Sequence, residues 1–258
     1  MNKEKVIKEL DKAFGKYKFF SEDHHYEKDK KKIGISVTTL IEEYTEEFDA
    51  EEEAKSQARK YNRNKEDILN EWKYKNEFAC RKGSTCHEYV QSLWTGEHWS
   101  YDNFDFSGKY NDAVCKIKNQ ADQFFEDYKD KMIHIRAEQI VGSEEYDIAG
   151  SVDGLFINKE TNQLILVDYK TNTYITGYNK DPYLKFFKPP LQDMIVDKLN
   201  HYKLQLSIYK YLIEKYTDLI IDKLVIIYTS EINKSYEIIE IPYLKEEVEN
   251  ILEWRKWE

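Results

Sequence analysis

An acidic residue and a lysine stand two positions apart at the end of an apolar segment, in Val167-Asp168-Tyr169-Lys170. Residues two apart in a strand project from the same face, so Asp168 and Lys170 are predicted to lie side by side. A second carboxylate, Asp153, stands in Gly150-Ser-Val-Asp-Gly154 on the preceding apolar segment. The flanking glycines allow backbone or ligand to approach closely. A short turn between the two segments would bring both carboxylates together.

Two convergent carboxylates suit a hard, oxygen-seeking cation such as Mg²⁺ or Mn²⁺. A lysine beside them can orient or deprotonate water and can stabilise charge on a phosphate. This set of groups is what metal-assisted hydrolysis of a phosphodiester requires. The plainer interpretation is an exposed ion pair between Asp168 and Lys170 at a strand edge, and the Asp-x-Lys pattern alone favours it.

The motifs taken together resemble a known family. Gly150-Ser-Val-Asp153, followed fifteen residues later by Asp168-Tyr-Lys170, resembles the core motif of the PD-(D/E)XK nuclease superfamily. Gly83-Ser-Thr-Cys-His87 upstream and Gln205-Leu-Ser-Ile-Tyr209 downstream resemble motifs of its RecB-like exonuclease branch. The likeness extends to phage exonucleases and the mitochondrial genome-maintenance exonuclease of that branch, through three features: Ser36-Val-Thr-Thr-Leu40, Trp72 and Glu138.

The resemblance implies a role for each matching residue. His87, Asp153 and Asp168 would be metal ligands, with the Tyr169 backbone carbonyl as a fourth, and Lys170 would be catalytic together with the two aspartates. Gln205 and Tyr209 would hold the DNA strand, and Glu138 is an additional candidate. A lone histidine on an amphipathic helix is usually structural, but the ordered set of motifs favours His87 as a ligand.

Two departures from the family pattern narrow the cofactor. The histidine helix often carries a glutamate one turn on, where Gln91 stands here, so no carboxylate is expected at that point. The CRISPR-associated relatives hold an iron–sulfur cluster on four cysteines that include a C-terminal group. This chain has Cys80, Cys86 and Cys115 and none beyond. We therefore expect Mg²⁺ or Mn²⁺ and no iron–sulfur cluster.

The elements that must position these residues follow from periodicity. Helical spacing dominates the first two-fifths, with a capped helix start at Ser36, another near Ser84-Thr85 and a helix over 113–128. Later segments alternate as strands over 133–141, 148–157 and 163–171, the last two forming a hairpin. A loop over 172–197 precedes a helix at 199–216, strands at 224–229 and 236–241, and a helix at 244–255.

This order predicts an α/β protein with a restriction-endonuclease-like mixed central sheet, flanking helices and an N-terminal helical lobe. The predicted division is a helical lobe over 1–130 that contributes His87, and a nuclease core over 131–258. Aromatic residues and lysines interleave in the long loop and either stack bases along a positive groove or anchor the loop. They are Tyr174, Tyr178, Lys180, Tyr183, Lys185, Phe186, Phe187 and Lys188.

Composition limits the remaining possibilities. The formal charge of −10 predicts weak non-specific binding to duplex DNA, although a narrow channel can carry a local field of opposite sign. The charged start, MNKEKVIKEL, and the lack of long apolar runs argue against a secretory leader and a membrane helix. We expect a cytoplasmic location, in a bacterial or phage-infected cell, and no secretion.

The sequence therefore predicts a metal-dependent DNA exonuclease that acts on single-stranded or free-ended DNA in replication, recombination or repair. Its expected partners are DNA and proteins of replication or recombination. One alternative is a structure-specific or restriction-type endonuclease of the same fold. Another is a DNA-binding accessory without catalysis, which the complete set of acidic residues, lysine and histidine argues against. RNA stays open as a substrate.

Overall fold

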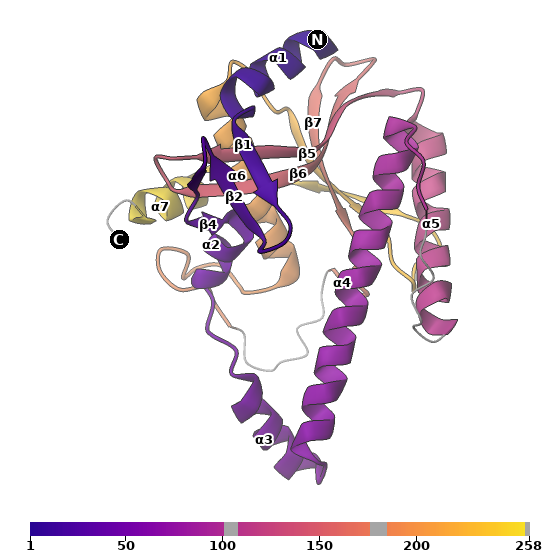
Figure 1. The fold of residues 1–258 in the computed structure, drawn as a ribbon, viewed down its shortest axis with the longest axis vertical. Coiled ribbons are helices and arrows are strands. Elements are labelled where there is room, and N and C mark those ends of the chain that lie inside the picture. The colour runs from indigo at the N-terminus through magenta and orange to yellow at the C-terminus, as the bar shows by residue number, and fades with distance from the viewer. Residues whose placement is uncertain (101–107, 176–184, 256–258) are drawn as a thin grey trace.

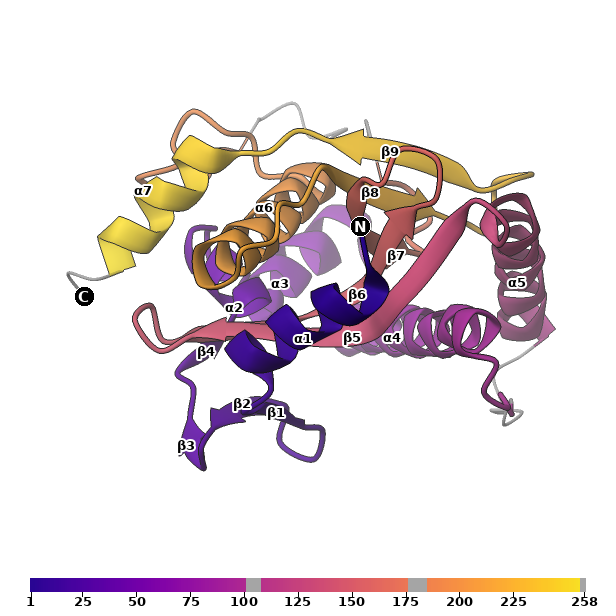
Figure 2. The same ribbon diagram turned by 90° about the horizontal axis from the view of Figure 1, so that it is seen from above.

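The fold is a mixed sheet with helices on both faces (Figures 1 and 2). This computed structural model describes residues 1–100, 108–175 and 185–255. The helices are α1 (Lys3–Phe14), α2 (Val37–Glu43), α3 (Ala50–Tyr61), α4 (Lys65–Thr95), α5 (Gly108–Tyr128), α6 (Lys198–Tyr216) and α7 (Lys245–Arg255). The strands are β1 (Tyr17–Phe20), β2 (His25–Lys28), β3 (Lys31–Lys32), β4 (Ile35–Ser36), β5 (Met132–Ser143), β6 (Ile148–Asn158), β7 (Leu164–Lys170), β8 (Lys223–Tyr228) and β9 (Glu237–Ile241). The prediction of a mixed α/β protein is confirmed.

The central sheet has six strands in the order β4-β6-β7-β8-β9, with β5 also paired to β6. Strands β6 and β7 form the predicted antiparallel hairpin, and β7 then runs parallel to β8. Because β7 pairs on both sides, its backbone hydrogen bonds are supplied by neighbours and its side chains can be buried on both faces. The strand that carries Asp168 and Lys170 is thus a central one.

Alternation along β7 separates two hydrophobic cores. Leu164 and Leu166 belong to a large core shared with α1, α2, α6 and α7, whereas Ile165 and Val167 belong to a smaller core with α4 and α5. By the same two-residue period, Asp168 and Lys170 continue the row of Leu164 and Leu166 toward α6. Figure 2 shows α6 on one side of the sheet and α4 and α5 on the other.

Helix α4 is longer than the sequence predicted. The expected start near Ser84-Thr85 is wrong, because one helix runs from Lys65 to Thr95 through Gly83 and ends at Gly96 in a left-handed conformation. An interior glycine costs a helix about 1 kcal/mol relative to alanine. Burial of Thr85, Cys86 and Val90 along the same helix offsets that cost. The first half of α4 projects from the body together with α3 (Figure 1).

The sequence predicted a helical lobe over residues 1–130, but this part of the chain also contains strands β1–β4. Ser36 caps α2 as predicted, its hydroxyl accepting from the Thr39 amide at 3.0 Å. Strands β1–β3 form a small antiparallel sheet, and β4 joins the central sheet beside β6. Leu10 of α1 and Leu40 of α2 lie in one core with Leu166. The expected helical lobe therefore contains strands and shares its core with the rest of the chain.

No helix in the described ranges is long and apolar enough to cross a membrane.

Candidate metal centre

Three neighbouring strands and one helix bring the acidic residues and the histidine to one place. The pairing of β6 with β7 ends at Gly154 and Val167, and one further step of that register sets Asp153 opposite Asp168. In the pairing of β5 with β6, Ala137 lies opposite Gly154 and Gln139 lies opposite Val152, so Glu138 is level with Asp153. The register therefore brings three carboxylates to neighbouring positions on adjacent strands. Asp153 and Asp168 share a face of the sheet, whereas the direction of the Glu138 side chain depends on its own backbone conformation.

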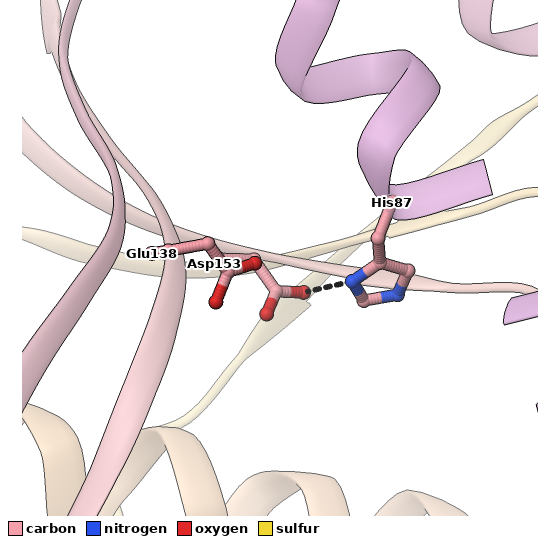
Figure 3. A group of neighbouring side chains, drawn as sticks. All are labelled: His87, Glu138 and Asp153. Carbon is pink, nitrogen blue, oxygen red and sulfur yellow. Dashed lines mark ion pairs between the residues drawn. The ribbon is translucent and has the colours of Figure 1, made fainter. Parts of the chain in front are cut away.

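His87 reaches this row from α4 (Figure 3). Its Nδ1 lies 3.4 Å from Oδ2 of Asp153. One ligand atom from each of His87, Glu138 and Asp153 lies within 4.8 Å of the others, which is close enough for a single cation to bind all three. The side chains come from three different elements and point toward one another. The two carboxylates suit a hard divalent cation, and the imidazole adds one nitrogen donor. The choice of Mg²⁺ or Mn²⁺ stays a prediction.

Asp153 carries the clearest electrostatic signature. Its side chain is only 13% exposed, and its Oδ2 accepts a hydrogen bond from the Tyr169 amide at 2.8 Å. Burial and the nearby Asp168 carboxylate raise the pKa of Asp153 well above its ordinary value, against the opposing effect of Lys170. Two acidic groups so close cannot both ionise freely without a compensating cation. These residues therefore fit a bound divalent ion.

Lys170 is held as an ammonium. Its Nζ lies 2.7 Å from Oδ2 of Asp168, and both side chains are largely buried, at 16% and 4% exposed. Burial alone would lower the pKa of Lys170, but the charges of Asp168 and Asp153 outweigh it and raise the pKa above the ordinary value. The exposed ion pair of the plainer interpretation is therefore not what forms, since this pair is buried beside the other acidic residues.

His87 is held as a neutral imidazole. Burial and the charge of Lys170 lower its pKa, against the opposing effects of Asp168, Glu138 and a hydrogen bond with the Tyr169 backbone. A neutral imidazole has a free ring lone pair for a metal ion. The Tyr169 backbone thus contacts both His87 and Asp153, and the role of its carbonyl as a metal ligand stays a prediction.

Glu138 has a backbone conformation that non-glycine residues rarely adopt. Its φ is 47°, in the left-handed region, within an otherwise extended strand. Such a conformation costs about 1–3 kcal/mol and persists where the surroundings impose it, often at functional sites. The Ser151 hydroxyl donates to its Oε2 at 2.7 Å. These two features orient the carboxylate next to Asp153.

Tyr209 of α6 lies against the strand that carries Asp153, and Gln205 contacts Tyr209. A Cβ built on Gly150 would sit 2.6 Å from Cε1 of Tyr209, so only glycine lets this ring pack there. Tyr209 is buried, and its hydroxyl accepts from Gln205 at 3.2 Å. Gln205 also donates to Thr38 at 3.4 Å. Tyr209 thus packs under the strand and holds Gln205, the less buried of the two, and the DNA-holding role of both stays a prediction.

The structure places the remaining candidates differently. It groups Glu138, rather than Asp168, with His87 and Asp153, while Asp168 pairs with Lys170 one strand away. In the long loop, Phe187 is buried and serves as an anchor, whereas Tyr174 and Phe186 are exposed. Lys185 pairs with Glu46, and Lys188 donates to the Glu43 carbonyl. Tyr178, Lys180 and Tyr183 lie outside the described residues.

Two residues beside the site were not singled out by the sequence. Ser151 supports Glu138, and Tyr202 lies under the Lys170 ammonium, 4.5 Å from it. Tyr202 precedes Gln205 by three positions, so the helical period already places both on one face. No sequence feature could have shown the contact of Ser151, because it depends on the left-handed backbone at Glu138.

The comparisons with known proteins add little to this geometry. No family model matches the chain, and no curated protein matches it. Among solved structures, one described as the crystal structure of SSO0001 matches over 67% of this chain and 83% of its own, at 12% identity and a TM-score of 0.27. A TM-score this low carries no argument about fold or function.

Proposed function

We propose that this chain is a metal-dependent deoxyribonuclease, most simply an exonuclease, with the restriction-endonuclease-like core of the PD-(D/E)XK superfamily and its RecB-like branch. The observation that carries the proposal is the row of Glu138, Asp153 and Asp168 across three strands, completed by His87 from α4 and Lys170 from β7. This set contains an imidazole, three carboxylates and an ammonium. Hydrolysis of a phosphodiester needs groups of these kinds.

The residues divide the work between them. His87, Glu138 and Asp153, with Asp168 beside them, would hold Mg²⁺ or Mn²⁺. When bound, the cation supplies a Lewis acid for the phosphate and lowers the pKa of a water ligand. Lys170, held as an ammonium, donates hydrogen bonds and stabilises the negative charge that builds on the phosphate in the transition state. The Tyr169 amide keeps Asp153 oriented toward His87.

DNA with free ends is the proposed substrate, single-stranded in the simplest case. Gln205, held by Tyr209 and Thr38, lies one turn of α6 after Tyr202, whose ring contacts Lys170, and would contact the strand. The negative net charge disfavours broad binding to duplex and confines contact to the site. The proposed setting is DNA replication, recombination or repair in the cytoplasm of a bacterial or phage-infected cell, beside proteins of those processes.

The test is a cleavage time course on end-labelled linear single-stranded DNA, linear duplex and closed circular single strands, each with Mg²⁺, Mn²⁺ or EDTA. The proposal expects cleavage of linear DNA with either metal and none in EDTA, because the carboxylates need a cation to bind a phosphate. Resistance of the circle identifies an exonuclease, and its cleavage identifies the endonuclease alternative. Undiminished cleavage in excess chelator would overturn the proposal.

A histidine pair provides the matched control. His87 faces Asp153, whereas His134 is partly buried between Trp94 and Phe156, away from the acidic row. His87→Ala should lose activity, and His134→Ala should keep it. Equal loss in the two variants would mean that histidine removal acts through the fold rather than through the metal.

A further inference from the structure

The Lys170 ammonium is held on two sides. Asp168 contacts it at 2.7 Å, and the ring of Tyr202 lies below it with the centroid 4.5 Å from Nζ. A cation within about 6 Å of an aromatic centroid is attracted by the electron-rich face, and the attraction grows when both groups are removed from water. Lys170 is largely buried, so the second condition is met.

Tyr202 is itself fixed in place. It lies on α6, whose first turn is capped by Asp197, and its hydroxyl donates to Oδ1 of Asn172 at 2.6 Å. Asn172 follows Lys170 by two residues. The tyrosine thus joins α6 to the segment that continues β7, and the ring is anchored at its far end. A ring fixed in this way gives the lysine one defined position.

We propose that Tyr202 is a positioning residue that keeps Lys170 aimed at the reacting phosphate while Asp168 engages a cation. This inference rests on the proposed function. The two contacts of Lys170 respond differently to a divalent ion. The Asp168 carboxylate is shared with any metal bound beside it, so its hold on the ammonium weakens when the ion binds. The ring of Tyr202 carries no charge and is not a metal ligand, so its hold persists.

The chain offers a matched control for the same kind of contact. Lys210 also lies over a tyrosine ring, with Nζ 4.9 Å from the centroid of Tyr243, and it also pairs with a carboxylate, Glu214. Lys210 and Tyr243 lie on the α6–α7 side of the fold. Within the described residues, no contact joins them to Glu138, Asp153 or Asp168. Tyr202→Leu and Tyr243→Leu therefore remove the same interaction, once at the site and once away from it.

The direct test needs no substrate, and its first comparison is made without metal. Protein with ¹³C at the lysine Cε is compared by NMR as parent, Tyr202→Phe and Tyr202→Leu, with the Lys170 signal assigned by its loss in Lys170→Ala. The ring should shift the Lys170 methylene protons upfield in the parent and in the Phe variant, and the shift should vanish in the Leu variant. Addition of Mg²⁺ should leave the upfield shift in place. An identical Lys170 signal in the parent and the Leu variant, or its loss on adding Mg²⁺, would overturn the inference.

Kinetics then separates positioning from packing. In single-turnover cleavage, Tyr202→Leu should be about 10- to 30-fold slower than the parent with DNA affinity unchanged, because a desolvated cation–ring contact that aims the lysine acts on turnover. Tyr202→Phe, which keeps the ring, should cleave at a rate close to that of the parent. Asn172→Ala, which leaves the ring and removes its anchor, should lose less. Tyr243→Leu should cleave like the parent.

The outcomes distinguish the two proposals. A parent that cleaves no nucleic acid overturns the proposed function, while the metal-free NMR comparison still decides whether Tyr202 holds Lys170. The positioning role of Tyr202 is overturned if Tyr202→Leu cleaves as fast as the parent. It is also overturned if the loss in Tyr202→Leu lies wholly in DNA affinity. Thermal unfolding of both Leu variants shows whether either loss comes from the fold.

Discussion

Two polar clusters lie side by side where α4 passes the end of β7, and they differ in charge balance. One is the candidate metal centre, to which α4 contributes His87. The other, here called the Lys82 cluster, consists of Lys82, Glu231 and Thr173. Gly83 lies between the two along the helix, and a Cβ there would make ordinary contact with Thr171 at 3.7 Å. Both clusters therefore lie along α4 where it passes the end of β7 and the residues that follow it.

The Lys82 cluster is balanced. Buried Lys82 pairs with Glu231 at 2.7 Å, and the Thr173 hydroxyl donates to the other Glu231 oxygen at 2.7 Å. Burial opposes ionisation of Glu231, but the hydrogen bonds from Lys82 and Thr173 outweigh it and lower its pKa. One cation meets one anion. Such a cluster requires no further ion and fixes α4 to the loop after β8.

The candidate metal centre has more carboxylates than cationic groups. Glu138, Asp153 and Asp168 face one ammonium and a histidine whose pKa is lowered, and the pKa of Asp153 is raised well above its usual value. The comparison teaches that burial alone does not mark a binding site. The Lys82 cluster, whose charges cancel, is structural. The candidate metal centre, where Asp153 and Asp168 are largely buried and Glu138 is exposed, has uncompensated carboxylates and is suited to an added cation.

The largest expected effect is on the cleavage rate of a Lys170 variant, because Lys170 has a proposed role in catalysis and Lys82 has a structural one. Lys170→Ala should slow cleavage by about 10²–10³-fold with metal binding retained, because it removes a charge-stabilising interaction made in the transition state and no proposed ligand. Asp168→Asn should lower both metal affinity and turnover. The measurement is single-turnover cleavage beside calorimetric metal titration. Near-parental cleavage by Lys170→Ala would mean that both lysines are structural, and the contrast between the clusters would fail.

The next effect concerns His87. His87→Ala should reduce metal affinity and cleavage by at least the roughly 10–100-fold that follows loss of a residue supporting a metal ligand. The fold should survive, since His87 is not among the buried core residues. Metal titration and thermal unfolding are measured on the same sample. Loss of the fold with unchanged metal affinity would assign His87 to packing.

Glu231→Gln tests the Lys82 cluster, where the expected effect is on stability. The change leaves Lys82 buried and charged without its counter-ion. We expect a loss of about 2 kcal/mol, below the roughly 3–5 kcal/mol of a fully buried pair, because the Glu231 side chain is 22% exposed. Urea denaturation gives the value. Metal affinity should not change. Loss of metal binding in this variant would show that the two clusters are not independent.

Asp153→Asn should have the smallest effect on stability, and of opposite sign. Because the folded-state pKa of Asp153 is raised, metal-free folded protein binds a proton that the unfolded chain releases. Parent stability therefore rises as pH falls from the raised pKa toward the ordinary value near 3.9. Asp153→Asn should remove this gain and raise the denaturation temperature at neutral pH. A lower denaturation temperature at neutral pH would contradict the charge excess.

Much of this architecture could be predicted because it follows local pattern. The β6–β7 hairpin and α6 repeat their apolar residues with regular periods, and Ser36 is a strong cap. The β1–β3 sheet was missed because strand burial there does not alternate, as in β2 with four half-buried residues. The helix through Gly83 was missed because packing of Cys86 and Val90 overrides the local glycine signal.

The site was predictable in its residues and less so in its grouping. Spacing alone indicated that Asp153 and Asp168 would converge, and they lie one step beyond the last partners of β6 and β7, Gly154 and Val167. The sequence could not show the left-handed backbone of Glu138, which turns a peripheral candidate into a neighbour of His87. Nor could it show that the Lys170 ammonium has both Asp168 and Tyr202 as partners, since those contacts depend on how α6 packs on the sheet.

Calorimetric titration of Mn²⁺ at neutral pH, without DNA, tests the central claim most directly. The variants are Asp153→Asn, which changes the cluster with excess negative charge, and Glu231→Gln, which changes the balanced one by the same chemical step. We predict that the parent and Glu231→Gln bind Mn²⁺ alike, with release of protons from the site, and that Asp153→Asn does not bind. A parent that binds no Mn²⁺, or an Asp153→Asn variant that binds as tightly as the parent, would contradict the account.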